Sequence, residues 1–330
     1  MTMGQKVSAA VILVASVVLA LRIGTLLYFD RGIPENLLVP AGKIFALKDK
    51  SFKFAVMSDT GSFNTSMERI VKHIRKTTDA KFILHLGDLV KYNNRTHFNW
   101  IAQELNGKLK GMPLYMISGN HEMSNGNKNL QVYEDVFGSP YYWFSYGDVL
   151  FIALDTSLHI IDDEQLEWLQ GMLRKIRPQF RRCVVYTHIP PVNPRNDEKE
   201  LDEVQRDKLA EILRGQKIDL MIAGHVHYFS VSQWAGITLV TVPSSGQEPR
   251  NNSGMLGYLV VNVPEKDAVT FEEHPVKTAV DRENVDVFMS ATLTKKETGW
   301  LAMLALALGI VGYFAYGTRK NLRIGEDFKV

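Results

Sequence analysis

Residues 220–227 read LMIAGHVH, an apolar run that ends abruptly in a glycine and two histidines. A short apolar run that stops at a glycine is typical of a buried strand followed by a loop. Four more polar groups interrupt apolar runs upstream, and with Gly224-His225-Val226-His227 they make five: Asp59-Thr60-Gly61, Gly87-Asp88, Gly119-Asn120-His121-Glu122 and His188. Four of the five directly follow a predicted strand, so they place Asp, Asn or His side chains at strand ends.

Strands alternate with helices through the middle of the chain. The apolar runs predict strands at 52–57, 82–86, 114–117, 141–146, 149–154, 183–186 and 220–223, and helical spacing predicts helices at 67–76, 98–109, 130–137, 165–173 and 201–213. Only short strands follow, at 229–234, 237–242, 258–263 and 269–273. This order predicts a layered α/β domain with a partly mixed sheet over residues 51–276.

The polar groups are candidate metal ligands. Loops that leave the carboxyl ends of strands in such a sheet converge on one edge. We therefore expect six side chains to meet there: Asp59, Asp88, Asn120, His188, His225 and His227. Two carboxylates, one amide and three imidazoles are too many for one catalytic ion and suit two. A carboxylate such as Asp88 can bridge both ions.

The ordered series resembles the calcineurin-like metallophosphoesterase superfamily, whose motifs run D-x-H or D-x-G, G-D, G-N-H-[ED], H and G-H-x-H. The resemblance covers residues 51–245, and Gly61 makes the pattern most similar to the purple acid phosphatase branch. It implies a layered β-sandwich flanked by helices and a metal-dependent phosphoric ester hydrolase, either a phosphatase or a phosphodiesterase.

The resemblance also distributes roles over the candidate residues. It implies that one ion is held by Asp59, Asp88 and His227 and the other by Asp88, Asn120, His188 and His225. His121 would contact the phosphate or protonate the leaving oxygen. Two ions, divalent or of mixed valence, would activate a hydroxide that attacks phosphorus in line. Fe, Zn and Mn all suit this mixed nitrogen and oxygen ligand set.

One ligand of the commoner branch is missing, because Gly61 stands where that branch has a histidine. The purple acid phosphatase branch supplies a tyrosine three residues after the second aspartate. Here that position is Lys91, and Tyr92 follows one place later. A loop can absorb such a shift, whereas in a strand it would reverse the direction of the side chain. Tyr92 is therefore a candidate ligand, and without it the first ion has three protein ligands plus solvent.

Both ends of the chain are apolar. Residues 7–29, broken by Arg22, predict either a transmembrane anchor or a cleaved signal peptide, with a buried soluble helix as a third interpretation. Residues 300–316 are uncharged and predict a transmembrane helix. Arg319, Lys320 and Arg323 follow it, which places the C-terminus in the cytoplasm and the middle of the chain on the extracytoplasmic side.

The predicted organisation has six parts. They are an anchor or signal peptide (1–29), a linker (30–50), the catalytic domain (51–276), a tether (277–298), a transmembrane helix (299–317) and a cytoplasmic tail (318–330). The formal charge of +2 offers no signal for nucleic-acid binding. Cys183 is the single cysteine, so no intrachain disulfide can form.

These features predict a membrane-anchored, dinuclear-metal phosphoesterase that acts on monoesters or diesters. A lipid or envelope-derived phosphate is a candidate substrate because the domain would lie near a bilayer. A non-catalytic metal-dependent sensor or scaffold is the alternative, supported by the missing ligand at Gly61. A structural membrane protein with a decayed domain is a third hypothesis, which the six ligand-type residues argue against. The oligomeric state is left open.

Overall fold

A computed structural model of the chain describes residues 33–46, 50–62, 65–91, 93, 95–123, 130–193, 195, 200–249 and 255–277, together with isolated positions between 13 and 24 and at 309. The chain divides into two units, Ile33–Arg282 and the combined ends Met1–Gly32 and Glu283–Val330. The two predicted membrane segments lie almost entirely outside the described residues. Within the described part, no helix is both long and apolar enough to span a bilayer.

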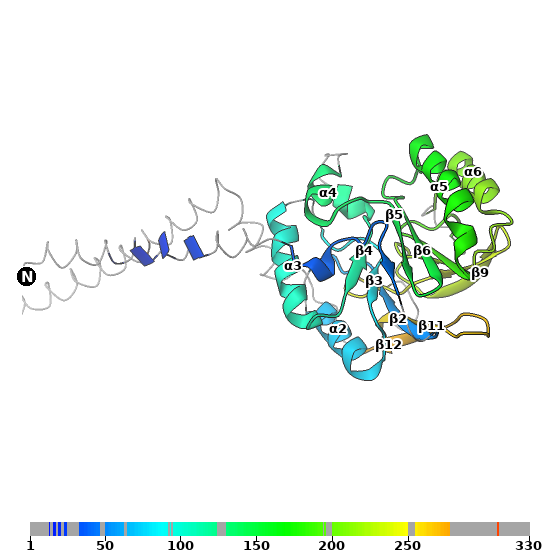
Figure 1. Cartoon of the computed structure of the whole chain (residues 1–330). Coiled ribbons are helices and arrows are strands. Elements are labelled where there is room, and N and C mark those ends of the chain that lie inside the picture. The colour runs from blue at the N-terminus through cyan, green and yellow to red at the C-terminus, as the bar shows by residue number, and fades with distance from the viewer. Residues whose placement is uncertain are drawn as a thin grey trace, which may run out of the picture. The chain divides into compact units, whose positions relative to one another are not determined.

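Two β-sheets form the centre of the unit 33–282 (Figure 1). The seven-stranded sheet has the order β1 (Ile44–Phe45), β5 (Tyr142–Tyr146), β6 (Val149–Leu154), β7 (Arg182–Thr187), β8 (Leu220–Ala223), β10 (Ile237–Thr241) and β9 (Ser230–Trp234). The five-stranded sheet has the order β12 (Thr270–Val276), β11 (Leu256–Val263), β2 (Phe52–Met57), β3 (Ile83–His85) and β4 (Leu114–Met116). Both sheets contain parallel and antiparallel pairs.

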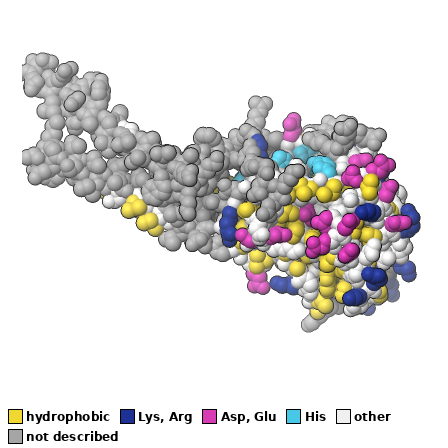
Figure 2. Space-filling model, turned by 90° about the horizontal axis from the view of Figure 1, so that it is seen from above, with side chains coloured by type: hydrophobic (Ala, Val, Ile, Leu, Met, Phe, Trp, Pro, Cys, Tyr) yellow, Lys and Arg dark blue, Asp and Glu magenta, His cyan; other side chains and the backbone are white. Residues whose placement is uncertain are grey.

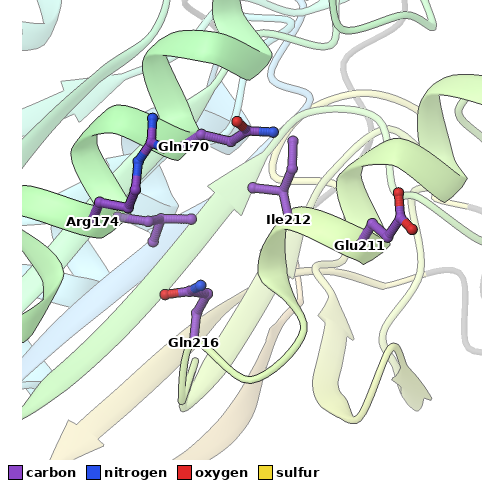
Figure 3. A pocket seen from close by; sticks show the side chains of 6 residues that line it. Gln170, Arg174, Glu211, Ile212 and Gln216 are labelled. Atoms are coloured by element: carbon purple, nitrogen blue, oxygen red, sulfur yellow. The ribbon is translucent and has the colours of Figure 1, made fainter.

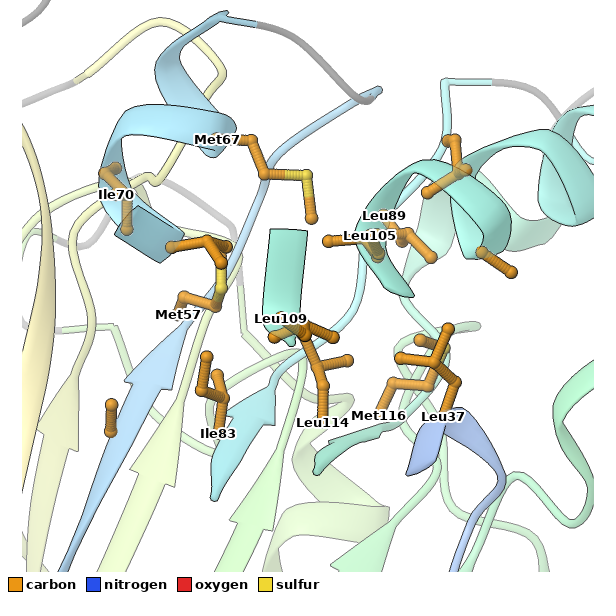
Figure 4. Packing of buried hydrophobic residues seen from close by; sticks show 14 of the residues in the cluster. Leu37, Met57, Met67, Ile70, Ile83, Leu89, Leu105, Leu109, Leu114 and Met116 are labelled. Atoms are coloured by element: carbon orange, nitrogen blue, oxygen red, sulfur yellow. The ribbon is translucent and has the colours of Figure 1, made fainter. Parts of the chain in front are cut away.

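Helices cover the outer faces of the two sheets. The longer ones are α2 (Thr65–Thr77), α3 (Arg95–Leu109), α4 (Gln131–Phe137), α5 (Asp163–Lys175) and α6 (Glu203–Leu213), and the short 3-10 helices are η1 (Glu35–Leu37), η2 (Asn120–Met123) and η3 (Arg177–Gln179). Apolar residues of α2, α3 and α4 pack on the five-stranded sheet, and those of α5 and α6 pack on the seven-stranded sheet. In Figure 4, helix α2, which carries Met67 and Ile70, lies over the strands that carry Met57 and Ile83, and the four residues belong to one cluster.

Strand β2 shows why this layered arrangement follows from the sequence. Alternate side chains of a strand point to opposite faces of the sheet. Phe52, Phe54 and Val56 enter the core between the two sheets, whereas Ala55 and Met57 enter the core under the helices. Both faces are therefore buried beyond Lys53, which explains why residues 54–57 read as an unbroken apolar run.

Phenylalanine rings fill the space between the sheets. Phe54 stacks on Phe82 with ring centroids 5.3 Å apart, and Phe144 stacks on Phe151 at 4.7 Å. The two stacked pairs meet edge to face, with Phe82 and Phe151 at 5.5 Å. Offset stacking and edge-to-face contacts add to the free energy gained by burying the rings. This cluster fixes the two sheets face to face.

The structure confirms an α/β fold with two sheets flanked by helices. The alternation of strands and helices predicts one partly mixed sheet, whereas the structure contains two sheets. These two sheets form the sandwich that the family resemblance implies. Helix α3 begins at Arg95, three residues before the predicted start. Helix α5 begins at Asp163 because the side chain of Asp162 caps it, accepting a hydrogen bond from the backbone of Gln165 at 2.8 Å.

Part of the predicted linker, residues 30–50, is structured. The 3-10 helix η1 carries Leu37, which is fully buried against the helical side of the five-stranded sheet. Strand β1 pairs in parallel with β5, with Ile44 opposite Ser145. A strand of two residues has no period for a sequence pattern to show, which explains why it was not predicted.

Replacing Phe82 by alanine should lower the free energy of unfolding by about 3–5 kcal/mol, because it opens a cavity where the two stacked ring pairs meet. Urea unfolding followed by circular dichroism measures the change. Val231→Ala is the control, since Val231 is 50% exposed on the edge strand β9 and should cost less than about 0.5 kcal/mol. Equal losses in the two variants would contradict this description of the core.

Candidate metal centre

The six predicted ligand residues that the structure describes lie in segments that follow strands at one end of the sandwich. Asp59, Asp88 and Asn120 follow strands β2, β3 and β4 of one sheet, and His188, His225 and His227 follow β7 and β8 of the other. The backbone N–H of His225 donates a hydrogen bond to Asp59 Oδ2 at 3.0 Å, which joins the loops of the two sheets. Figure 2 shows histidine side chains gathered on one face of the molecule.

One group of ligand atoms comes from Asp88, His188 and His225, whose candidate ligand atoms all lie within 4.8 Å of one another. Asn120 joins this group, because its Oδ1 is 3.1 Å from His188 Nε2. His188 Nδ1 is 2.6 Å from the carbonyl oxygen of Leu86. A carbonyl can only accept, so Nδ1 carries a proton and Nε2 is the nitrogen that faces the group. These four residues fit the ligand set of one ion.

A second group forms around Asp59, which is fully buried. Its Oδ1 accepts no hydrogen bond from the described residues, and His227 Nε2 lies 3.3 Å away. His227 Nδ1 donates to the carbonyl oxygen of Glu248 at 2.7 Å, so Nε2 again faces the group. Buried carboxylate oxygens are normally satisfied. An unsatisfied oxygen opposite an imidazole nitrogen suits a cation between them, so these residues fit a second ion.

Strained backbone accompanies the candidate ligands. Asp59, Asp88, His225 and His227 have φ angles of 55°, 54°, 68° and 60°, in the left-handed region that residues other than glycine rarely adopt. Each such residue costs on the order of 1–3 kcal/mol and persists only where the surrounding structure enforces it. Strain of this kind concentrates at functional sites, which supports a shared function for the four residues.

Two glycines let the ligand loops approach one another. A Cβ atom on Gly119 would overlap both the backbone nitrogen and the Oδ1 of Asp88. A Cβ atom on Gly224 would overlap the hydroxyl oxygen of Ser58. Any side chain at either position would push a ligand loop away from its neighbour, so the close grouping of ligands requires glycine there.

The buried carboxylate of Glu122 holds two of the loops in place. It accepts hydrogen bonds from the backbone N–H groups of Asp88 at 2.9 Å, Val90 at 3.1 Å and Gly119 at 2.6 Å. Burial and the nearby charge of Asp88 raise the pKa of Glu122 to about 7, against the influence of the N–H donors. The structure thus gives Glu122 a role in shaping the loops.

The electrostatics of the site favour a cation. Burial would raise the pKa values of Asp59 and Asp88, but neighbouring histidines hold both below their usual range. Burial would lower the pKa of His188, but Asp88 and Asp59 outweigh it and raise the pKa to about 9. Burial and the proximity of His188 lower the pKa of His225 to about 3. The two carboxylates therefore stay ionised, and a metal ion bound beside them would displace the proton on His188 Nε2.

His121 lies at the solvent side of the group. Its backbone N–H donates to Asp88 Oδ1 at 2.8 Å, and its ring Nδ1 is 3.2 Å from the carbonyl oxygen of Lys91. The side chain is 34% exposed, and Nε2 is 3.8 Å from Asp88 Oδ2. The ring therefore presents Nε2 beside the ligand group while remaining accessible to a substrate.

Tyr92, the remaining predicted ligand, lies outside the described residues, and its role stays a prediction. The structure shows two further residues, outside the sequence motifs, that contact residues of the ligand-bearing segments. Asp155, directly after β6, accepts a hydrogen bond from Ser118 at 2.8 Å. His159 packs its ring edge to face on His225, with centroids 5.4 Å apart, and has a φ of 62°. Asp155 directly follows the apolar strand β6, as most of the candidate ligands directly follow a strand, so a search for polar residues at strand ends would identify it.

A surface cavity of about 340 Å³ lies apart from these residues, between α5 and α6 (Figure 3). It is lined by Gln170, Leu173, Arg174, Glu211, Ile212 and Gln216. None of these is a candidate ligand, and the cavity shares no residue with the metal groups.

Comparison with known proteins matches residues 52–229 to the family model described as calcineurin-like phosphoesterase. Among curated proteins, a probable cyclic nucleotide phosphodiesterase from Rhodococcus erythropolis is 33% identical over 38% of this chain and 44% of its own length. The serine/threonine-protein phosphatase CPPED1 of Mus musculus is 26% identical over 54% of this chain and 64% of its own length. The matched part of the chain thus spans less than two thirds of the length of these two relatives.

Solved structures share the fold at low identity. A purple acid phosphatase from yellow lupin (Lupinus luteus), PPD1, superposes with a TM-score of 0.59 at 15% identity, covering 70% of this chain and 52% of that one. GAP50, described as the anchor in the inner membrane complex of Plasmodium, gives a TM-score of 0.54 at 15% identity, covering 74% and 94%.

Replacing Glu122 by glutamine should lower the free energy of unfolding by about 1–3 kcal/mol, because an amide N–H₂ replaces one acceptor and leaves a buried backbone N–H unpaired. Chemical denaturation measures this change. Glu167→Gln on the exposed side of α5 is the matched control and should leave stability unchanged. Wild-type stability in Glu122→Gln would rule out the proposed role in loop positioning.

Proposed function

The chain belongs to the calcineurin-like phosphoesterase family, and on that premise we propose that it hydrolyses phosphate esters with two metal ions while tethered to a membrane. The observation that supports the two-ion part is the presence of two ligand groups, Asp88 with Asn120, His188 and His225, and Asp59 with His227; the family resemblance implies that Asp88 belongs to both. One group fits an ion through four residues, and the other has a buried, unsatisfied oxygen on Asp59.

The residues that would hold the ions divide between the two groups. Asp59, Asp88 and His227 would hold one ion, and Asp88, Asn120, His188 and His225 the other. When bound, the ions supply positive charge that stabilises the phosphate oxygens and activates water. The protein contributes the fixed geometry, through the carbonyls that orient His188 and His227 and through Glu122, which holds the Asp88 and Gly119 loops.

His121 is suited to proton transfer. Contact with the carbonyl oxygen of Lys91 keeps a proton on Nδ1, so Nε2 is the atom that faces the substrate. A protonated Nε2 donates to the oxygen of the leaving group as the bond to phosphorus breaks. General acid catalysis of this kind contributes roughly 10²–10⁴-fold to a rate.

The substrate is a phosphate monoester or diester. The relatives include proteins described as a cyclic nucleotide phosphodiesterase, a glycerophosphodiester phosphodiesterase and a protein phosphatase, so their names support both classes. The D-x-G pattern at Gly61 resembles the purple acid phosphatase branch and slightly favours monoesters. A lipid or envelope-derived phosphate is the proposed natural substrate, because the apolar segment 300–316 would keep the domain near a bilayer.

A non-catalytic metal-dependent sensor or scaffold is the second candidate. Its support is the glycine at position 61, which removes one ligand of the commoner branch. The fold does not decide between the two, since its structural neighbours include both a purple acid phosphatase and a protein described as an anchor. Binding of one ion per chain without hydrolysis would favour the scaffold.

The purified chain should hydrolyse nitrophenyl phosphate or its bis ester with Mn²⁺, Zn²⁺ or Fe, and a chelator should abolish the activity reversibly. Asp88→Asn removes the charge proposed to be shared and should lower kcat/KM by more than the roughly 10–100-fold that loss of an outer-shell partner costs. Asp163→Asn, on the exposed start of α5, is the control. Normal metal binding without hydrolysis of either ester would contradict the catalytic proposal.

The proposed topology predicts which parts of the chain are reached from outside an intact cell. An epitope tag inserted in the tether 277–298 should bind antibody in intact cells. A tag placed after Val330 should bind antibody only in permeabilised cells. The positive charges that follow residue 316 set this orientation. External access to the C-terminal tag in sealed cells would overturn the orientation.

A further inference from the structure

The space beside Gly61 is filled by another side chain. A Cβ atom built on Gly61 would lie 2.9 Å from Cγ of Gln247, 3.2 Å from its Nε2 and 3.3 Å from its Cδ. These distances mean that the carboxamide arm of Gln247 occupies the volume where a side chain at position 61 would begin. A histidine at 61, as in the commoner branch of the family, and the glutamine in its present place exclude one another.

The loop that carries Gln247 is fastened to the residues of the first ion. The backbone N–H of Gln247 donates to the carbonyl oxygen of Asp59 at 2.9 Å, and the hydroxyl of Ser244 donates to the same oxygen at 3.0 Å. The next residue, Glu248, accepts the proton of His227 Nδ1. The loop therefore holds the backbone of Asp59 and the ring of His227, so Gln247 is fixed beside both.

A carboxamide is chemically suited to this place. Amide oxygens bind the harder divalent cations as neutral ligands. The second group already contains one, from Asn120, beside an imidazole at 3.1 Å. The ligand set that the family resemblance implies for the first ion is Asp59, Asp88 and His227, one ligand fewer than the four of the second.

We propose that Gln247 takes the place of the side chain that Gly61 lacks, and that its carboxamide oxygen completes the ligand set of the first ion. This inference rests on the two-ion function proposed above. Gly61 and Gln247 then act as a pair, in which the missing side chain at one position makes room for the ligand from the other.

Metal binding tests this role without relying on activity. Gln247→Leu keeps most of the volume of the side chain and removes the oxygen, and Gln247→Glu keeps an oxygen and adds charge. The number of Mn²⁺ ions bound and the Kd of each are measured by competition with a chelator. Gln233→Ala, whose glutamine bonds Thr238 within the β9–β10 hairpin, is the control.

Wild type and Gln233→Ala should bind two ions. Gln247→Leu should hold one with unchanged Kd and bind the other roughly 10–100-fold more weakly, the range seen when a partner of a metal site is lost. Gln247→Glu should bind both at least as tightly as wild type. Circular dichroism confirms folding, and Gln247→Ala replaces Gln247→Leu if the leucine variant unfolds.

Two results would overturn the assignment. Wild-type binding of both ions by the leucine and alanine variants would remove Gln247 from the site. Loss of one ion in Tyr92→Phe, with no loss in the Gln247 variants, would give the place to Tyr92 instead. A single ion in wild type would instead refute the two-ion function on which the inference rests, so the two failures are distinguishable.

Discussion

The buried carboxylate of Asp59 connects the fold to the site. One oxygen accepts the backbone N–H of His225 from the loop of the opposite sheet, and the other lies unsatisfied 3.3 Å from the ring of His227. Removing a carboxylate from water costs several kcal/mol unless opposite charge and hydrogen bonds offset it. The histidines offset part of this cost, and a metal ion would offset the rest, so the carboxylate that joins the loops of the two sheets is also the one proposed to bind an ion.

The apolar core stabilises the fold against the unfavourable features of the site. Four candidate ligands have left-handed backbone conformations, and a glutamate is buried beneath them to hold the loops. Each feature lowers stability by itself. The stacked phenylalanines between the sheets and the apolar residues under both helical layers provide the opposing free energy. Rigid strands thus place ligand-bearing loops that would not keep their geometry in isolation.

The sequence predicts well those features that repeat with a period or follow a strand. Strand β8 lies where the apolar run 220–223 predicts it, and the side chains of Asp88 and His188 meet as expected from their places at strand ends. Strand β1 was missed because two residues carry no period. The contact of Gln247 with Gly61 is not predictable from the sequence, because the two residues lie 186 positions apart and only tertiary structure brings them together. No local pattern records such a contact.

Loops from both sheets are proposed to form one site for two ions. Anomalous diffraction from crystals of the protein grown with Mn²⁺ tests this proposal most directly. We expect two peaks about 3.5–4 Å apart, one bonded to Asp88, Asn120, His188 and His225 and the other to Asp59, Asp88 and His227. A single peak, or peaks away from these residues, would contradict it.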